Sequence, residues 1–257
     1  MDGRPGALAP IDARWLGRVP YREAWDLQKR LAAARADGAI PDQLLLLEHP
    51  PVLTLGRGAD EAHVLATPDE LEALGIEVLR VERGGEVTYH GPGQLVAYPI
   101  LRLADRGLLL RPLVRALEAA MVETCAALGV AAERRDSHPG CWMDPEGKEP
   151  RKIGALGLRV ERGTSYHGIA LNVDVDLAAF ALIDPCGLPG LVSTSIAREA
   201  GSPDVAPSTQ RVALAAATFA QALASNLGAM LAGTLPPDAD PAVERAVLER
   251  LATPVAA

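Results

Sequence analysis

The sequence predicts an α/β protein of the α+β type, in which a mixed β-sheet is flanked by helices. Strand-like apolar runs alternate with segments of helical periodicity, but without the strict βαβ spacing of a doubly wound parallel sheet. The chain has 257 residues and is 49% hydrophobic, which is enough for one substantial core. No internal repeat or low-complexity segment interrupts this pattern.

The first elements are a helix and two buried strands. Residues 21–37 place Tyr21, Trp25 and Leu31 on one helical stripe, and Gly38 is typical of a helix end. The run "DQLLLLEHPPVLTLGR" is apolar except at its two prolines, so it predicts two buried strands.

A short capped helix and three strands follow. Thr67, Pro68 and Glu70 form the start signal of a helix, with Thr67 as the N-cap and proline at the first helical position. "IEVLRVE" alternates as a strand does. "RGGEVTYHGPGQLVAYPI" then predicts a loop, a short strand, a glycine-proline turn and a longer strand.

The second half predicts two long helices around a strand pair. The first helix has about four turns and ends near Gly129; its apolar positions are Leu113, Leu117, Ala120 and Met121. "RKIGALGLRVERGTSYHGIALNVDV" predicts two strands with a tight turn over residues 161–163. The second helix has apolar positions at Val212, Ala216, Phe219, Leu223 and Leu227.

We expect three parts in the chain. Residues 1–20 are interpreted as an N-terminal extension, residues 21–233 as the catalytic domain, and residues 234–257 as a peripheral C-terminal tail with one helix.

Composition excludes several classes of protein. A formal net charge of −8 disfavours nucleic-acid binding, which depends on Lys and Arg against phosphate. No apolar run has the length of a signal peptide or a membrane span, so we expect a cytoplasmic protein without a membrane partner. Three cysteines form neither a disulfide framework nor a zinc half-site.

Cofactor motifs are absent as well. The stretch "PEGKEP" lacks the Ser or Thr that completes a P-loop, and "GRGADE" lacks the third glycine of a dinucleotide site. The five histidines have no metal-ligand spacing. We therefore expect neither a cofactor nor a metal.

One cysteine lies where core packing does not explain it. Cys125 fits an apolar helical face, whereas Cys186 in "IDPCGLPG" lies between Pro185 and Gly187 in a tight loop. A thiol with a pKa of about 8.5 needs a nearby cation or base to become a nucleophile at neutral pH. Lys152, at the start of an apolar strand, is one candidate; alternatively, it only borders the sheet.

A second stretch, "RGGEVTYHGPGQ", also has two interpretations. Its glycines are either hairpin residues or positions where backbone N–H groups approach a ligand. His90 adds a polar group beside them, as a site that polarises an acyl carbonyl would require.

These stretches carry a family resemblance. "RGGEVTYHGPGQLVAYPI", "RKIGALGLRVERGTSYHGIALNV" and "PCG" together resemble the lipoyl(octanoyl) transferases of the biotin/lipoate protein ligase superfamily. The resemblance covers roughly residues 21–231 and implies a fold similar to the catalytic domain of biotin and lipoate protein ligases. It implies that Cys186 holds the acyl group as a thioester and that Lys152 activates this cysteine.

The resemblance also implies three substrate-contacting segments. They are Arg83, Gly84, Gly85, Glu86, Val87, Thr88, Tyr89 and His90, then Gly154, Ala155 and Leu156, and finally His167, Gly168 and Ile169. The stretch "DPEGKEP" departs from the family pattern as a small loop extension.

The implied reaction needs two protein partners and no ATP. Octanoyl-acyl carrier protein would be the donor, and the acceptors would be lipoyl domains of 2-oxoacid dehydrogenase E2 subunits and the glycine cleavage H protein. Because carrier protein is acidic, we expect a basic patch at the pocket mouth, built from some of Arg57, Arg151, Arg159 and Arg162. A monomer is expected.

Three alternatives are weighed against this interpretation. An ATP-dependent lipoate or biotin protein ligase would not need Cys186. A cysteine hydrolase would need a Cys, His and Asn or Asp pattern that the sequence lacks. A noncatalytic carrier-protein-binding module would be favoured only if Cys186 or Lys152 were replaced.

Overall fold

The computed structural model describes residues 9–202 and 206–236. The strands are β1 (Ile11–Arg18), β2 (Gln43–Glu48), β3 (Val52–Leu55), β4 (Glu77–Arg80), β5 (Val87–His90), β6 (Gln94–Ile100), β7 (Cys141–Met143), β8 (Arg151–Glu161), β9 (Thr164–Asn172), β10 (Val192–Ser193) and β11 (Leu231–Thr234). The α-helices are α1 (Tyr21–Ala36), α2 (Pro68–Ala73), α3 (Leu110–Ala127), α4 (Ile196–Glu199) and α5 (Thr209–Asn226). Short 3₁₀ turns cover Glu61–His63, Leu103–Arg106, Leu177–Leu182 and Pro185–Gly187.

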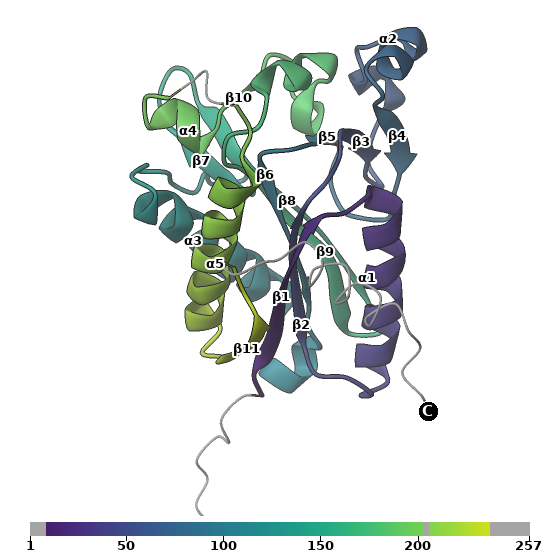
Figure 1. The fold of residues 1–257 in the computed structure, drawn as a ribbon, viewed down its shortest axis with the longest axis vertical. Helices are drawn as coiled ribbons and strands as arrows, with labels where there is room; N and C mark the ends of the chain where they lie inside the picture. Colours follow the sequence, from purple (N-terminus) through teal and green to yellow (C-terminus); the bar gives the residue numbers. More distant parts are fainter. Residues whose placement is uncertain (1–8, 203–205, 237–257) are drawn as a thin grey trace, which may run out of the picture.

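A mixed sheet forms the body of the molecule. Its strand order is β10-β8-β9-β6-β2-β1-β11, and β7 pairs with β8. The strands from β2 through β6 and β9 to β8 are antiparallel, whereas β1 is parallel to both β2 and β11. Helices α3 and α5 cover one face and α1 covers the other (Figure 1). The predicted fold class, a mixed sheet flanked by helices, is confirmed.

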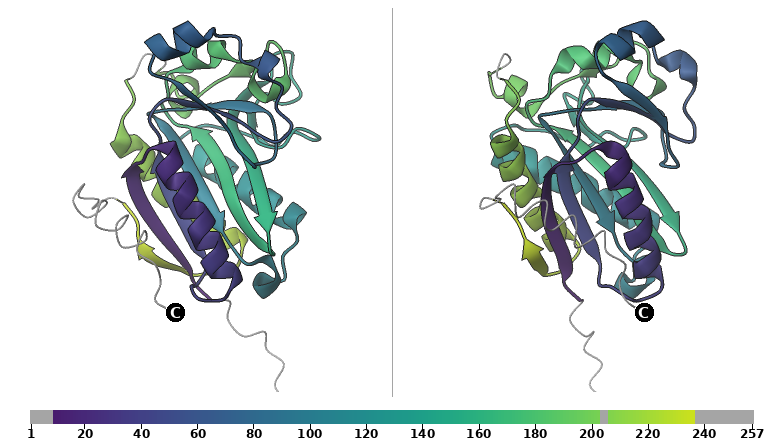
Figure 2. Two further views of the ribbon diagram at one scale, coloured as in Figure 1. Left: turned by 90° about the vertical axis from the view of Figure 1, so that its right-hand side faces the viewer. Right: turned by 45° about the vertical axis from the view of Figure 1, so that its right-hand side comes forward.

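A second, smaller sheet with order β4-β3-β5 lies beyond one end of the main sheet (Figure 2). Helix α2 accompanies it and has the expected capping box: Thr67 accepts a hydrogen bond from the Glu70 N–H at 3.3 Å, and the Glu70 carboxylate accepts one from the Thr67 N–H at 2.7 Å. The small sheet brings the 83–90 segment to the same end as the Cys186 turn.

The structure moves both expected domain boundaries. We expect residues 1–20 to form an extension, yet β1, which falls within that range, lies inside the main sheet between β2 and β11. Ile11, Ala13 and Trp15 are buried in the main core, which explains why this segment belongs to the domain. Strand β11 crosses the boundary at residue 233. The expected helix of the tail falls within 237–257, outside the described residues.

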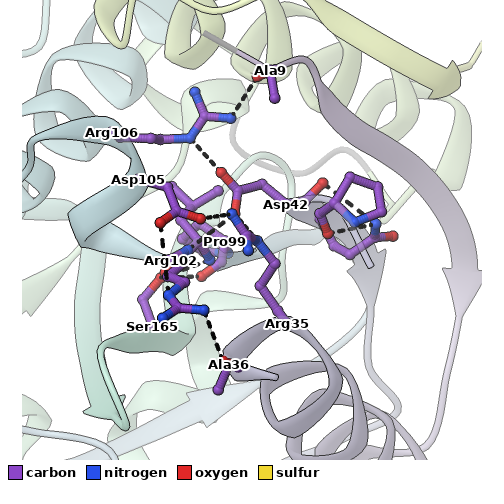
Figure 3. Close-up of polar contacts among 12 residues, drawn as sticks. Ala9, Arg35, Ala36, Asp42, Pro99, Arg102, Asp105, Arg106 and Ser165 are labelled. Atoms are coloured by element: carbon purple, nitrogen blue, oxygen red, sulfur yellow. Dashed lines mark hydrogen bonds and ion pairs between the residues drawn. The ribbon is translucent and has the colours of Figure 1, made fainter. Parts of the chain in front are cut away.

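A buried ionic cluster joins α1, β2 and the 3₁₀ turn at residues 103–106 (Figure 3). The Asp42 carboxylate pairs with Arg35 Nε at 2.5 Å and also with the guanidinium of Arg106. It accepts a further hydrogen bond from the Arg102 N–H at 3.0 Å. Arg35 reaches Asp105 as well, at 2.6 Å. The cluster lies on the opposite end of β2 from the small sheet and fixes α1 against the main sheet.

Candidate active site

The Cys186 thiol is presented by a tight turn. Residues Pro185–Gly187 form one turn of 3₁₀ helix, closed by a hydrogen bond from the Gly187 N–H to the Asp184 carbonyl at 3.0 Å. Cys186 has φ +61°, in the left-handed region that costs a residue with a Cβ about 1–3 kcal/mol. Strained backbone of this kind concentrates at functional sites. The side chain is half-buried rather than exposed.

The structure brings Lys152 and Cys186 together across 34 residues of sequence. The Lys152 Nζ donates a hydrogen bond to the Cys186 Sγ at 3.2 Å. Strand β8 lies between β10 and β9, so Lys152 does not simply border the sheet. An amine at this distance can exchange a proton with the thiol.

A cavity of about 370 Å³ opens beside this pair, within the size range of small-molecule sites. Both Lys152 and Cys186 line it, together with most of the segments that the resemblance implied. Two expected residues do not line it. Tyr89 packs against Phe180 in the core of the small sheet, and Gly154 lies against Met121 and Cys141. Thr88 and His90 lie on the opposite face of β5 from Tyr89 and line the cavity.

Close backbone contact places the 83–85 loop on β8. The Gly84 N–H donates to the Leu158 carbonyl at 3.0 Å. A Cβ on Gly157 would lie 2.5 Å from the Gly84 carbonyl oxygen, so only glycine permits this approach. The glycines of this region therefore build one wall of the cavity rather than only a hairpin.

Arg83 brings a buried cation to the cavity. Its guanidinium donates to the Thr54 carbonyl at 2.6 Å and to the Gly84 carbonyl at 3.1 Å, and within the described residues it has no ion pair with a carboxylate. Burial lowers the pKa of Arg83. Such a charge stabilises a nearby anion, including a Cys186 thiolate or a developing oxyanion.

Three buried histidines near the cavity are held neutral. Burial is the main cause in each: it lowers the pKa of His49 to about 4 and that of His167 to about 3, and puts the pKa of His90 well below its usual range. His49 bonds the Val19 carbonyl at 2.6 Å and the Tyr98 hydroxyl at 2.8 Å. At neutral pH these rings are therefore uncharged; His49 and His90 form hydrogen bonds, whereas both ring nitrogens of His167 lack a partner among the described residues.

Sequence reasoning missed several residues of the cavity wall. They are Tyr21, Tyr98, Leu110, Val114, Pro139, Gly157 and Ala170. Gly157 and Ala170 lie within strands that the sequence predicted, next to residues expected at the site. Tyr21, Leu110 and Pro139 come from α1, α3 and the loop before β7, and no local signal links those elements to the site.

Two of the four arginines that were candidates for the expected basic patch are paired with carboxylates. Arg151 pairs with Glu199 at 2.9 Å, and Arg162 lies in the turn at the far end of β8, where it pairs with Asp37. Arg159 is half-buried on β8, which leaves Arg57 as the exposed and unpaired member of the four within the described residues. Glu199 and Asp37, whose positions depend on the fold, neutralise Arg151 and Arg162.

The described residues hold neither a candidate metal cluster nor a membrane-spanning helix. Over residues 9–202 and 206–236, no group of three or more His, Cys, Asp or Glu side chains is arranged to hold a metal ion. None of the helices in the same ranges has the length and apolar character needed to cross a bilayer.

Comparisons with known proteins agree with this geometry. The model of the lipoyl protein ligase A/B catalytic domain matches residues 20–219. An octanoyltransferase of Alkalilimnicola ehrlichii is 47% identical over 75% of this chain and 84% of its own length. An octanoyltransferase of Paraburkholderia xenovorans is 40% identical over 91% of this chain and 93% of its own.

Solved structures show the same fold at low identity. A lipoate-protein ligase A bound with ATP has a TM-score of 0.64 and 16% identity, covering 95% of this chain and 97% of its own. A lipoate protein ligase homologue from Thermoplasma acidophilum has a TM-score of 0.63 and 15% identity, with 93% of each chain covered. The family match over residues 20–219 therefore places the chain among proteins with the lipoyl protein ligase A/B catalytic domain, here with a thiol and an amine at its pocket.

The sequence relatives identify the family within that class. At 40–47% identity over most of both chains, this chain belongs to the octanoyltransferase family of enzymes. The resemblance given by the three motifs is confirmed.

Proposed function

We propose that the protein transfers an octanoyl group from acyl carrier protein to a lysine of lipoyl domains, through a thioester on Cys186. The observation that supports this most directly is the 3.2 Å contact between the Lys152 amine and the Cys186 thiol at the cavity wall. The sequence relatives are octanoyltransferases by name, which points to octanoyl as the acyl group. The cavity offers an apolar compartment that could hold its chain.

The first step exchanges one thioester for another. Lys152 takes the thiol proton, and the Cys186 sulfur attacks the octanoyl carbonyl of the donor. The new C–S bond forms as the bond to the carrier's sulfur breaks, and Lys152 returns the proton to the departing thiolate. Since the bond type does not change, the step is nearly isoenergetic and needs no ATP.

The second step forms an amide. The amine of the acceptor lysine attacks the acyl carbon, the bond to Cys186 breaks, and Lys152 receives the proton that the amine loses. The amide is more stable than the thioester, so this step drives the transfer. In this proposal Arg83, His90 and the rest of the wall hold the acyl group and its carbonyl in place.

Partners and location complete the proposal. The acceptors are lipoyl domains of 2-oxoacid dehydrogenase E2 subunits and the glycine cleavage H protein, and both partners bind transiently to a monomeric enzyme. Cytoplasmic action is consistent with three cysteines that are all free thiols in the structure.

Intact-protein mass spectrometry tests the thioester. The protein is incubated with octanoyl-acyl carrier protein without ATP, beside a Cys186→Ser variant. We expect one added octanoyl group that hydroxylamine removes, and no such thioester in the variant. Absence of the adduct on the wild-type protein, with transfer only when free octanoate or lipoate and ATP are added, would assign the protein to the ATP-dependent ligases instead.

A further inference from the structure

The Lys152 side chain is confined by a segment that no step of the proposed reaction uses. Residues 140–142 lead into and form β7, which pairs with β8 so that Trp142 lies opposite Lys152. A bulge between Cys141 and Trp142 shifts the register at this point. The shift places Trp142 opposite Lys152 instead of Ile153, and Gly140 lies close to the same lysine side chain.

Trp142 gives the lysine an aromatic partner. Its side chain is fully buried, and the Lys152 Nζ lies 4.9 Å from the ring centroid, within the range of a cation–π interaction. The indole is fixed by a hydrogen bond from its Nε1 to the His138 carbonyl at 3.0 Å. An aromatic ring attracts an ammonium and not a neutral amine, so this contact favours the charged form of Lys152.

Gly140 holds the lysine stem from another direction. Its φ is +138°, and a Cβ there would lie 2.8 Å from Lys152 Cε and 2.5 Å from the Gly154 carbonyl oxygen. The Gly140 N–H donates to Glu118 Oε1 at 3.0 Å. Glu118 is 1% exposed, and its other oxygen accepts from Arg115 at 3.0 Å. Helix α3 therefore fixes the position of Gly140 against the lysine.

We propose that Gly140, held by Glu118, and Trp142, held by the His138 carbonyl, form a positioning clamp that keeps Lys152 charged and directed at Cys186. This inference rests on the proposed function and adds to it the resting state of the pair, an ammonium beside a thiolate. In that state the nucleophile is formed before the donor binds. Trp142 acts through Lys152 and is not among the residues that line the cavity, where the Cys186 sulfur would meet the acyl carbon.

Other charged groups surround the pair and set the background for any test. On the elements packed around it the charged or titratable groups are Arg83, Glu86, His63, His90, His167, Asp184, Arg135, His138, Arg151, Glu199 and the neutral Cys141. Arg135 requires its own control, since its guanidinium lies 5.1 Å from the centroid of the same Trp142 ring. Loss of the indole releases this cation as well as Lys152.

The test is the pH profile of Cys186 alkylation by iodoacetamide, with Cys186→Ser giving the background from the buried thiols. Without the ring, Lys152 is a weaker base and the thiolate forms only at higher pH. We expect Trp142→Leu to raise the profile's midpoint by about 0.5–1 pH unit, and Trp142→Phe to restore at least half of that shift. Arg135→Gln and Trp15→Leu, the latter altering a buried tryptophan of β1, should leave the midpoint unchanged.

A second measurement covers the case in which Trp142→Leu does not fold. Fluorinated tryptophan, incorporated into a Trp15→Phe, Trp25→Phe background, weakens the ring's attraction for a cation while nearly keeping its shape. The midpoint should rise with the number of fluorine atoms. An unchanged midpoint in the folded variants and across the fluorinated series would overturn the clamp.

The two proposals fail separately. If wild-type protein forms no octanoyl adduct, the proposed transfer fails whatever the alkylation profile shows. If the adduct forms but the midpoint does not move, the transfer stands and the clamp is wrong.

Discussion

Removal of the Asp42 carboxylate should destabilise the protein strongly. The Asp42 and Arg106 side chains are 3% and 2% exposed, and Asp42 is the carboxylate that pairs with Arg106 among the described residues. After the substitution Arg35 would still have its ion pair with Asp105. Arg106 would have only its hydrogen bond to the Ala9 carbonyl, at 2.9 Å, and no carboxylate partner in the part of the chain that the structure describes. Breaking a buried pair so that one charge remains uncompensated costs about 3–5 kcal/mol. We expect Asp42→Ala to lower the free energy of unfolding by that amount.

Urea denaturation followed by circular dichroism measures this loss. Asp37→Asn provides the matched control, because its pair with Arg162 leaves both side chains more than half exposed. An exposed pair contributes less than about 1 kcal/mol. The double variant Asp42→Ala, Arg106→Leu should lose less than the sum of its two single variants, because no buried cation remains unpaired. A loss for Asp42→Ala no larger than that of Asp37→Asn would refute the reasoning.

Two further predictions concern pH and the cavity wall. His49 and His167 have pKa values of about 4 and about 3 when folded, against about 6.5 otherwise, so the unfolded chain binds more protons below neutrality. The contribution of these neutral histidines to the free energy of unfolding is therefore fully present above about pH 6.5. It falls towards pH 4 by up to about 1.4 kcal/mol per pH unit for each histidine. Equal urea midpoints at pH 5 and pH 7.5 would contradict this. Gly157→Ala should raise the KM for the octanoyl donor at least several-fold by displacing the Gly84 carbonyl, whereas Gly58→Ala, whose Cβ would meet nothing nearer than 3.6 Å, should not.

Local signals predicted most of the elements. A few neighbouring residues determine each of three features: the capping box of α2, the apolar run of β2, and the hairpin of β8 and β9. Each of them forms where expected. Strand β1 was missed although Ile11, Ala13 and Trp15 alternate, because its polar residues weaken the pattern. Its place in the sheet comes from pairing with β2 and β11, which lie far away in sequence.

In the candidate site, too, some features follow from neighbouring residues and others from contacts between distant segments. The proline and glycine beside Cys186 indicated a tight turn, and the turn is present. That Lys152 reaches this cysteine depends on where the 185–187 turn docks against β5 and β8, which no local pattern encodes. The contact between Trp142 and Lys152 depends on a register shift between β7 and β8, where Ile153 of β8 is the extra residue, and such a shift is a feature of pairing rather than of composition.

The position of β1 also has a practical meaning for anyone who shortens this chain. The family match begins at residue 20, and a truncation guided by that boundary would delete β1 entirely. Strand β11 would lose the strand it pairs with, and the fully buried β2 would become an open edge of apolar residues. Open edges of this kind pair with other chains, so the shortened protein should aggregate although every residue of the proposed site is retained.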